Sequence, residues 1–376
     1  MASPEVLDFA KLLAPILGEN PAGKPLREQV SHDSIYYKLK DARSAARAAE
    51  RSLLFSDESG AAQQQPDWRP ILQSAPKVLA EQSKDLEVTG WLIEALAREH
   101  GFAGLRDGFR LARGLVEGFW EGLYPLPDEE GMSTRVAPLA ALNGVDGDGV
   151  LIAPILSAPI TQVGGRGAVS VQDYRQALEV DRIEDPDKRA QRIAQGVATM
   201  DQVREAVRAT SAEFFRNLLE DIDGCAEEWN HLSRELDERC GLGPDGVPAS
   251  PPSSNIRNTL QTCRESVGQI ARDVLGGAEA SGAGAVAEAT EAGKAVTAGG
   301  KIQSREAAFR MLLQVAEFFR RTEPHSPVSY ALEQAVRWGR MSLPELWSEL
   351  FPDEGTRGQA FKWLGIRPKS ESGGTE

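Results

Sequence analysis

The sequence predicts a mainly α-helical protein built from several helical bundles. Apolar residues recur every three or four positions through most of the chain, which is the spacing of one helical face. Short clusters of glycine, proline, asparagine and serine separate these segments, as is typical of bundles with short loops. One small β-hairpin is predicted near 160–171, where two apolar runs flank a glycine-rich turn.

The totals describe an ordinary globular chain of two or three domains, with 376 residues, 41% apolar and 26% charged. No run of about 18 apolar residues exists, and the first residues lack a basic region followed by an apolar one. We therefore expect neither a transmembrane helix nor a secretory signal. The cysteines, Cys225, Cys240 and Cys263, form no C-x-x-C pair, which argues against a disulfide scaffold or cysteine zinc site and favours the reducing cytoplasm.

The net charge of −14 is unevenly distributed along the chain. Lys+Arg minus Asp+Glu is 16 − 23 = −7 for residues 1–165, again 16 − 23 = −7 for 166–303, and 10 − 10 = 0 for 304–376. A strongly acidic chain repels phosphate backbones, so no nucleic acid partner is expected. The neutral C-terminal segment lacks this self-repulsion, which favours self-association there.

Helical spacing begins near the N-terminus. Residues 3–17 are predicted to form a short helix capped by Ser3, and the breakers at 18–23 predict a turn. A second helix is expected over 35–55, followed by a polar loop at 56–66.

Stronger helical patterns follow from residue 67. They predict helices from 67 to about 79, over 86–98 and over 105–123, with the glycines of 101–104 ending one helix and starting the next. Residues 125–138 are expected to form a loop, and 139–143 a short apolar run.

The middle of the chain again has helical spacing. One long helix or two are expected over 193–219, and another is expected to end at Cys240, before Gly241. A further helix is predicted over 256–275, and residues 276–303, dominated by Ala, Gly, Glu and Thr, predict a flexible linker.

The C-terminal segment, 304–366, has explicit helix boundaries. Ser326 is a good N-cap, Pro327 suits the first helical position, and Gly339 is interpreted as the stop. The apolar face between them consists of Val328, Ala331, Leu332, Ala335 and Val336. Ser342-Leu-Pro-Glu345 then forms a capping box that opens another helix.

No catalytic, cofactor-binding or metal-binding residues are predicted. The four histidines lie far apart, and phosphate-loop and nucleophile-elbow motifs are absent. Asp146 and Asp148 carry two ligands of a calcium loop without the others, so we interpret 146–149 as a turn.

Several motifs resemble a known family. R-R-T-E-P-H-S-P-V-S-Y at 320–330, V-R-W-G at 336–339 and W-L-G-I at 363–366 resemble the C-terminal signature of the TssA (ImpA-related) family of type VI secretion proteins. D-W-R at 67–69, S-K-D-L at 83–86, G-F-A-G-L-R-D-G-F at 101–109 and F-W-E-G-L-Y-P at 119–125 resemble the ImpA N-terminal domain, over about residues 12–160.

The patterns and the resemblance together predict five regions. They are an ImpA-like N-terminal helical domain (1–165), a middle helical domain (166–275), a flexible linker (276–303), a C-terminal helical oligomerisation domain (304–368) and a disordered tail (369–376).

The resemblance implies a non-enzymatic protein that organises assembly of the baseplate and of the contractile tail. It implies a ring-like homo-oligomer formed through the C-terminal domain, and contacts with baseplate, inner-tube and sheath proteins. A monomeric adaptor or regulator of one partner is the alternative, followed by a hydrolase with an unrecognised pair of carboxylates.

The expected contact residues lie in the C-terminal domain, because the resemblance implies that this domain forms the oligomer. Aromatic residues are among them, because aromatic side chains often anchor interfaces. A tight inter-helix turn around Glu323 and His325 is the alternative interpretation of that stretch. The candidates for the oligomer interface are Glu323, His325, Tyr330, Arg337, Trp338, Trp347 and Trp363.

Overall fold

The structure is a computed structural model of the 376-residue chain. It divides into two compact units, an N-terminal unit, Met1–Ala285, and a C-terminal unit, Val286–Glu376. The described residues are 2–28, 34–55, 65–129, 131–163, 167–243, 246, 248–276, 309, 311–313, 315–317, 320 and 328–341.

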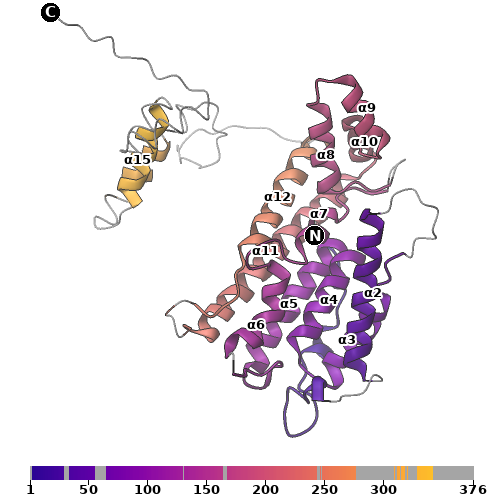
Figure 1. The fold of residues 1–376 in the computed structure, drawn as a ribbon, viewed down its shortest axis with the longest axis vertical. Helices are drawn as coiled ribbons and strands as arrows, with labels where there is room; N and C mark the ends of the chain where they lie inside the picture. The colour runs from indigo at the N-terminus through magenta and orange to yellow at the C-terminus, as the bar shows by residue number, and fades with distance from the viewer. Residues whose placement is uncertain are drawn as a thin grey trace, which may run out of the picture. The chain divides into compact units, whose positions relative to one another are not determined.

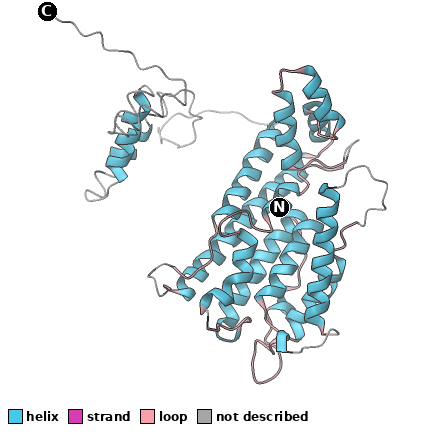
Figure 2. Cartoon of the chain, viewed as in Figure 1, coloured by secondary structure: helices cyan, strands magenta, loops and turns pink. Residues whose placement is uncertain are grey.

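Helices make up nearly all the regular structure of the described residues (Figures 1 and 2). Those of the N-terminal unit are α1 (Phe9–Leu12), η1 (Leu26–Glu28), α2 (Ile35–Phe55), α3 (Arg69–Glu81), α4 (Leu86–Glu99), α5 (Gly101–Phe119), η2 (Trp120–Gly122), α6 (Met132–Asn143), α7 (Ile152–Ser157), α8 (Val171–Asp181), α9 (Pro186–Ala194), α10 (Met200–Arg208), α11 (Ala212–Cys240) and α12 (Ser254–Ile270). The described helix of the C-terminal unit is α15 (Val328–Arg340). The predicted fold class, mainly α, is confirmed.

The predicted hairpin corresponds to a short antiparallel contact. Pro159 and Ser170 form an isolated bridge, and the Ile160 N–H donates to the Val169 carbonyl at 2.8 Å. The centre of the expected turn, 164–166, lies outside the described residues. The described flanks therefore pair at one point without forming a sheet.

Helix α4 lies at the centre of the N-terminal unit. Eleven of its residues are buried, and it contacts α2, α3, α5, α6 and α7. A helix that is apolar on all sides is one that neighbours surround. Asp85 starts it by accepting hydrogen bonds from the Glu87 N–H at 2.7 Å and the Val88 N–H at 3.2 Å, which is an N-cap.

Helices α4 and α5 approach closely because α5 carries glycines on the contact face. A Cβ on Gly104 would lie 2.5 Å from the Leu96 carbonyl oxygen, and one on Gly108 would lie 2.8 Å from Ile93 Cγ1. The prediction that 101–104 separates two helices is wrong in part. Gly101, with φ +55°, makes the turn, whereas Gly104 lies inside α5 as a packing residue.

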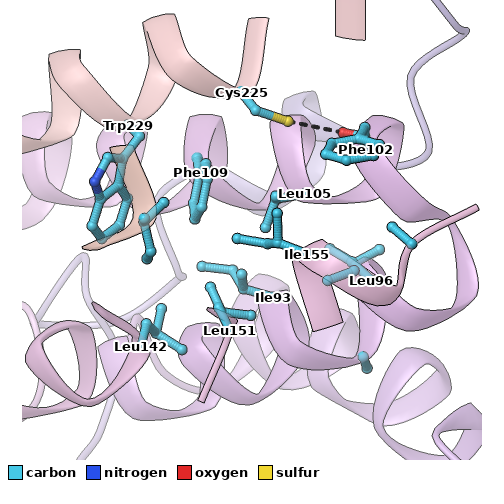
Figure 3. Packing of buried hydrophobic residues seen from close by; sticks show 14 of the residues in the cluster. Ile93, Leu96, Phe102, Leu105, Phe109, Leu142, Leu151, Ile155, Cys225 and Trp229 are labelled. Carbon is cyan, nitrogen blue, oxygen red and sulfur yellow. Dashed lines mark hydrogen bonds between the residues drawn. The ribbon is translucent and has the colours of Figure 1, made fainter. Parts of the chain in front are cut away.

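The core between α5 and α11 is aromatic (Figure 3). The Phe109 and Trp229 ring centroids lie 4.8 Å apart, and the Cys225 thiol donates to the Phe102 carbonyl at 3.1 Å. Ion pairs of Arg106 with Asp221 and of Arg113 with Glu228 advance along both helices in the same direction, so the helices run parallel. Parallel neighbours need a long connection, which α6 to α10 provide.

The first predicted helix is much shorter than expected. α1 covers only Phe9–Leu12 and begins after Asp8, not Ser3. The Ser3 N–H donates to Asp221 Oδ1 at 3.0 Å and the Val6 N–H to Asp107 Oδ2 at 2.6 Å. Buried carboxylates satisfy these backbone groups, so this segment has no need of helical hydrogen bonds.

Two further predictions of helix boundaries are wrong. α6 begins at Met132 and includes Pro138, although 125–138 was expected to be a loop. The single or double helix over 193–219 is instead the end of α9, all of α10 and the start of α11. Capping explains these breaks, because Thr199 and Ser211 each accept a hydrogen bond from the backbone N–H three residues later.

One hydrophobic cluster extends from Leu12 to Ala271, on both sides of residue 165. The division at 165 and the other predicted boundaries stay predictions. The predicted linker, except Gly276, and the predicted tail lie outside the described residues. None of the helices in the described part of the chain is long and apolar enough to cross a membrane.

Candidate contact surface and buried polar clusters

The structure describes Tyr330, Arg337 and Trp338 among the seven predicted contact residues, and places all three on α15. Tyr330 is 65% exposed, Arg337 is also exposed, and Trp338 is partly buried. The other four candidates lie outside the described residues: Glu323, His325, Trp347 and Trp363.

The inner face of α15 packs within the C-terminal unit. Val336 and Ser329 are buried on this face. A Cβ on Gly339 would lie 2.6 Å from Cζ of Phe309. Gly339 was interpreted as the helix stop, but it lies inside α15 and permits this close approach instead.

The predicted apolar face of α15 is only partly covered. Val336 is buried and Leu332 partly buried, but Val328, Ala331 and Ala335 are exposed. Among the described residues, the short C-terminal stretch contributes five large exposed apolar side chains, Met311, Leu313, Val315, Val328 and Tyr330, against seven in all of residues 2–276. Such a concentration is typical of surfaces that contact other proteins.

Ion pairs link α15 to residues that precede it in the C-terminal unit. Arg320 pairs with Glu333 of α15 and with Glu317, the latter at 3.4 Å. All three side chains are more than a third exposed, so each pair contributes little to stability.

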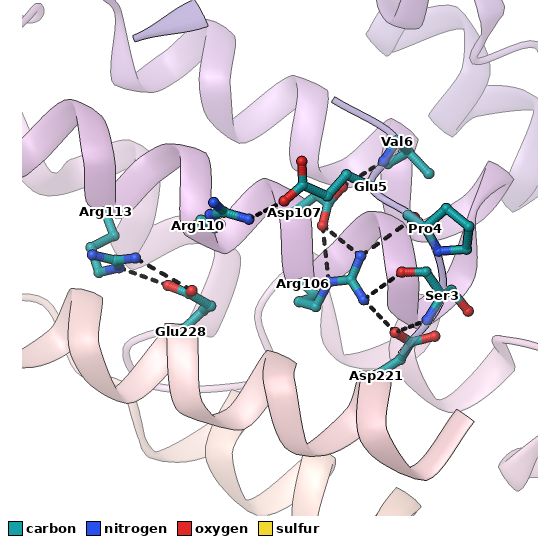
Figure 4. Close-up of polar contacts among 10 residues, drawn as sticks. All are labelled: Ser3, Pro4, Glu5, Val6, Arg106, Asp107, Arg110, Arg113, Asp221 and Glu228. Carbon is teal, nitrogen blue, oxygen red and sulfur yellow. Dashed lines mark hydrogen bonds and ion pairs between the residues drawn. The ribbon is translucent and has the colours of Figure 1, made fainter. Parts of the chain in front are cut away.

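A buried polar cluster holds the N-terminal segment against α5 and α11 (Figure 4). The Arg106 guanidinium bridges Asp107 and Asp221, whose side chains are 0% and 4% exposed, and Nη1 donates to the Ser3 carbonyl at 3.0 Å. The two carboxylates also accept the Ser3 and Val6 backbone N–H groups. These hydrogen bonds favour a structural role for the paired carboxylates over the acid–base role that a hydrolase needs.

A second buried cluster surrounds Lys84. Its ammonium group is fully buried and donates to the carbonyls of Leu12 at 2.7 Å and Leu79 at 2.8 Å. It also lies 5.1 Å from the Phe119 ring centroid. Burial lowers the pKa of Lys84 to about 8. The cation lies at the C-terminal end of α3, where the helix dipole favours positive charge, and it joins α1, α3 and α5.

The buried cysteines are poor nucleophiles at neutral pH. Burial raises the pKa of Cys240 to about 11 and that of Cys263 to about 12, so both remain thiols. Within the described residues, no group of three or more His, Cys, Asp or Glu side chains could hold a metal ion.

The described residues thus form an α-helical protein with structural polar clusters inside and exposed apolar residues gathered in the C-terminal unit. These are features of proteins that act by contacting other proteins. Residues 13–144 match the family model described as ImpA, N-terminal, type VI secretion system.

Two known proteins extend the similarity. The chain is 27% identical to the type VI secretion system component TssA1 of Pseudomonas aeruginosa over 352 residues, which is 93% of this chain and 96% of TssA1. It is also similar to the solved N-terminal domain, including the conserved ImpA_N region, of the TssA component from Burkholderia cenocepacia. That match has a TM-score of 0.57 and 26% identity, and covers 71% of this chain and 94% of the solved one. The predicted resemblance to the TssA family is confirmed, and the relatives support a component of the type VI secretion system.

The structure gives physical reasons for two of the motifs behind that resemblance. In 101–109, the apolar residues are core, Gly104 and Gly108 admit α4, and Arg106 with Asp107 holds the N-terminal segment. In 83–86, Lys84 and Asp85 join three helices and cap the central one. Sequence analysis identified these motifs but did not predict these contacts.

Proposed function

We propose that this protein is a cytoplasmic, non-enzymatic assembly component of a type VI secretion system, forming a ring-like homo-oligomer through its C-terminal unit. The ring would organise the baseplate and the growing tail through contacts with baseplate, inner-tube and sheath proteins. The observation that carries the proposal is the set of exposed apolar side chains around Tyr330 and Val328. Similarity to TssA1 and to the solved TssA domain supports it.

Charge favours self-association at the same place. Residues 304–376 carry no net charge, whereas the rest of the chain carries −14. Copies of the C-terminal unit can therefore approach with less repulsion than copies of the N-terminal unit. A contact that repeats from copy to copy gives a ring of defined size only if the rotation between neighbouring copies returns to the first copy.

Mass in solution tests the ring. We expect the full chain to form a discrete assembly by light scattering, and Tyr330→Arg to lower its mass by placing a bulky cation in an apolar contact. Leu242→Arg is the matched control, because Leu242 is 71% exposed in the N-terminal unit, and it should leave the mass unchanged. A monomeric wild-type chain would contradict the ring and favour the adaptor hypothesis.

A further inference from the structure

A groove on the N-terminal unit lies between α2 and α4 on one side and α7 with its preceding turn on the other. Its volume is about 530 Å³. Arg47, Arg51 and Arg98 line the first side, and Val150, Ala153 and Pro154 the second. A second pocket of about 320 Å³ is also lined by Val150 and includes Arg43 and Glu94.

Two of the four arginines in this groove are held by buried or half-buried carboxylates. Arg43 Nε donates to Glu94 Oε1 at 2.7 Å, and the Glu94 side chain is 1% exposed. Arg98 Nη2 donates to Glu50 Oε2 at 2.9 Å, and the Arg98 guanidinium lies 4.2 Å from the Trp68 ring centroid. These two guanidinium groups are therefore fixed in place and have their counter-ions.

The other two arginines, Arg47 and Arg51, are not held in this way by any carboxylate that the structure describes. Arg47 and Arg51 form neither an ion pair nor a hydrogen bond with the residues that the structure describes, and Arg47 is half-buried. Burial lowers the pKa of Arg47 most; the charge of Glu94 partly offsets this effect, and the charges of Arg43, Arg98 and Arg51 lower the pKa further. An unpaired cation in such a place is costly, and a bound carboxylate would remove that cost.

The buried polar atoms of the groove are also incompletely satisfied. Glu94 Oε2 has no hydrogen-bond partner among the described residues, although the side chain is almost fully buried. This oxygen accepts hydrogen bonds, so the group that satisfies it is an N–H or O–H donor and not a second carboxylate.

The opposite side of the groove determines which anion fits. Val150, Ala153, Pro154 and Ala158 give it an apolar surface, which a small inorganic anion cannot use. Nucleic acid is disfavoured by the net charge of −14. Arg47 and Arg51 are four positions apart on α2, so their side chains start about 6 Å apart. A protein segment with carboxylates at similar spacing and an apolar side matches both walls.

We propose that this arginine groove, defined by Arg43, Arg47, Arg51 and Arg98 opposite Val150 and Ala153, binds an acidic, partly apolar segment of a partner protein. Arg47 and Arg51 bind the carboxylates of the segment, and α7 packs against its apolar side chains. The groove lies wholly within the N-terminal unit, so this site is independent of ring formation by the C-terminal unit.

The experiment is a fluorescence-anisotropy titration of the full chain with a labelled peptide of leucine and alanine that carries two glutamates four residues apart. Arg47→Gln with Arg51→Gln should weaken binding at least about ten-fold, because two charge-assisted hydrogen bonds are lost. Arg192→Gln is the matched control, because Arg192 is exposed on α9, away from the groove, and it should bind as wild type does.

Two further variants test the groove without removing an arginine. Ala153→Asp places a carboxylate on the apolar wall and should abolish binding. Asp148→Asn should tighten it, because Asp148 is an exposed carboxylate that lines the groove and repels an acidic ligand. Added salt should weaken wild-type binding through screening.

Several results would overturn the proposal. Equal binding of a glutamine version of the peptide would show that carboxylates are not recognised, and competition by inorganic phosphate at the peptide's own concentration would show a general anion site. Unchanged affinity of the double arginine variant would place binding elsewhere. Loss of a cooperative thermal transition in that variant would show that both arginines already serve the fold. A monomeric chain that binds the peptide would leave this proposal intact and contradict the ring alone.

Discussion

Helices α5 and α15 both carry an apolar face, which is fully covered within the chain on α5 and only partly covered on α15. Phe102, Leu105 and Phe109 of α5 are 3% exposed or less, and α11 lies against them. On α15, Val328 and Ala331 of the predicted apolar face remain exposed. Periodicity in the sequence therefore identifies an apolar face but not its partner, which for α5 lies over a hundred residues away in the same chain.

The largest loss of stability is expected from a substitution in the covered apolar face of α5. Phe109→Ala should lower the free energy of unfolding of the N-terminal unit by about 3–5 kcal/mol, because it empties a fully buried site against Trp229. Tyr330→Ala, at a 65% exposed position, should change stability by less than about 0.5 kcal/mol. Urea denaturation followed by tryptophan fluorescence measures both changes. Equal losses of stability would show that the covered Phe109 and the exposed Tyr330 do not differ in their contribution to folding.

The dependence of stability on pH tests the buried ammonium group of Lys84. The pKa of Lys84 is about 8 when folded and its ordinary value is 10.5, so the unfolded chain holds this proton over a wider range. The free energy of unfolding should therefore rise as pH increases from 8 towards 10.5, by up to about 3 kcal/mol from this group.

Comparison with Lys84→Met isolates that contribution. Cys263, with its pKa raised to about 12, contributes with the opposite sign, because its folded state keeps a proton that the unfolded state loses. Denaturation of both proteins at pH 7.5, 8.5 and 9.5 measures the difference in slope. A wild-type slope no steeper than that of Lys84→Met would show that the ammonium group is not buried as described.

Substitutions of the two packing glycines, one in α5 and one in α15, should have the smallest effects on stability. Gly104→Ala should cost about 1–3 kcal/mol, because the new methyl group meets the backbone carbonyl of Leu96. Gly339→Ala should cost less than about 1 kcal/mol, because it meets the ring of Phe309, which can turn, and alanine favours a helix. The melting temperatures of both variants measure these losses. A larger loss for Gly339→Ala would show that Gly339, and not Gly104, is the more tightly packed position.

Much of the helical architecture could be predicted where local signals agree. The range 35–55 was predicted as one helix and is α2, and the helix predicted over 86–98 is α4. α6 was missed because Pro138 argues against a helix, yet contacts with α4 and α12 hold it in place. Residues 3–8 were predicted as helix because periodicity carries no information on the distant Asp107 and Asp221.

The candidate sites were predictable to different degrees. Tyr330, one of the predicted contact residues, is exposed on α15, and its part in a contact stays a prediction. Arg43, Arg47 and Arg51 are four positions apart on α2, but the sequence analysis did not single them out, because the opposite wall comes from α7, about a hundred positions later. Which arginines have counter-ions depends on Glu50 and Glu94, and only the folded arrangement determines this.

The parallel pairing of α5 with α11 has a consequence for synthesis of the chain. Contacts such as Cys225 with Phe102 span 123 positions, so α5 is completed long before its partner leaves the ribosome. Until then the nascent chain carries an uncovered aromatic face, a condition that favours chaperone binding and aggregation. Translation must therefore pass beyond Trp229 before the ImpA-like region can finish folding. The part of the N-terminal unit that contains α5 and the part that contains α11 thus complete their folding together.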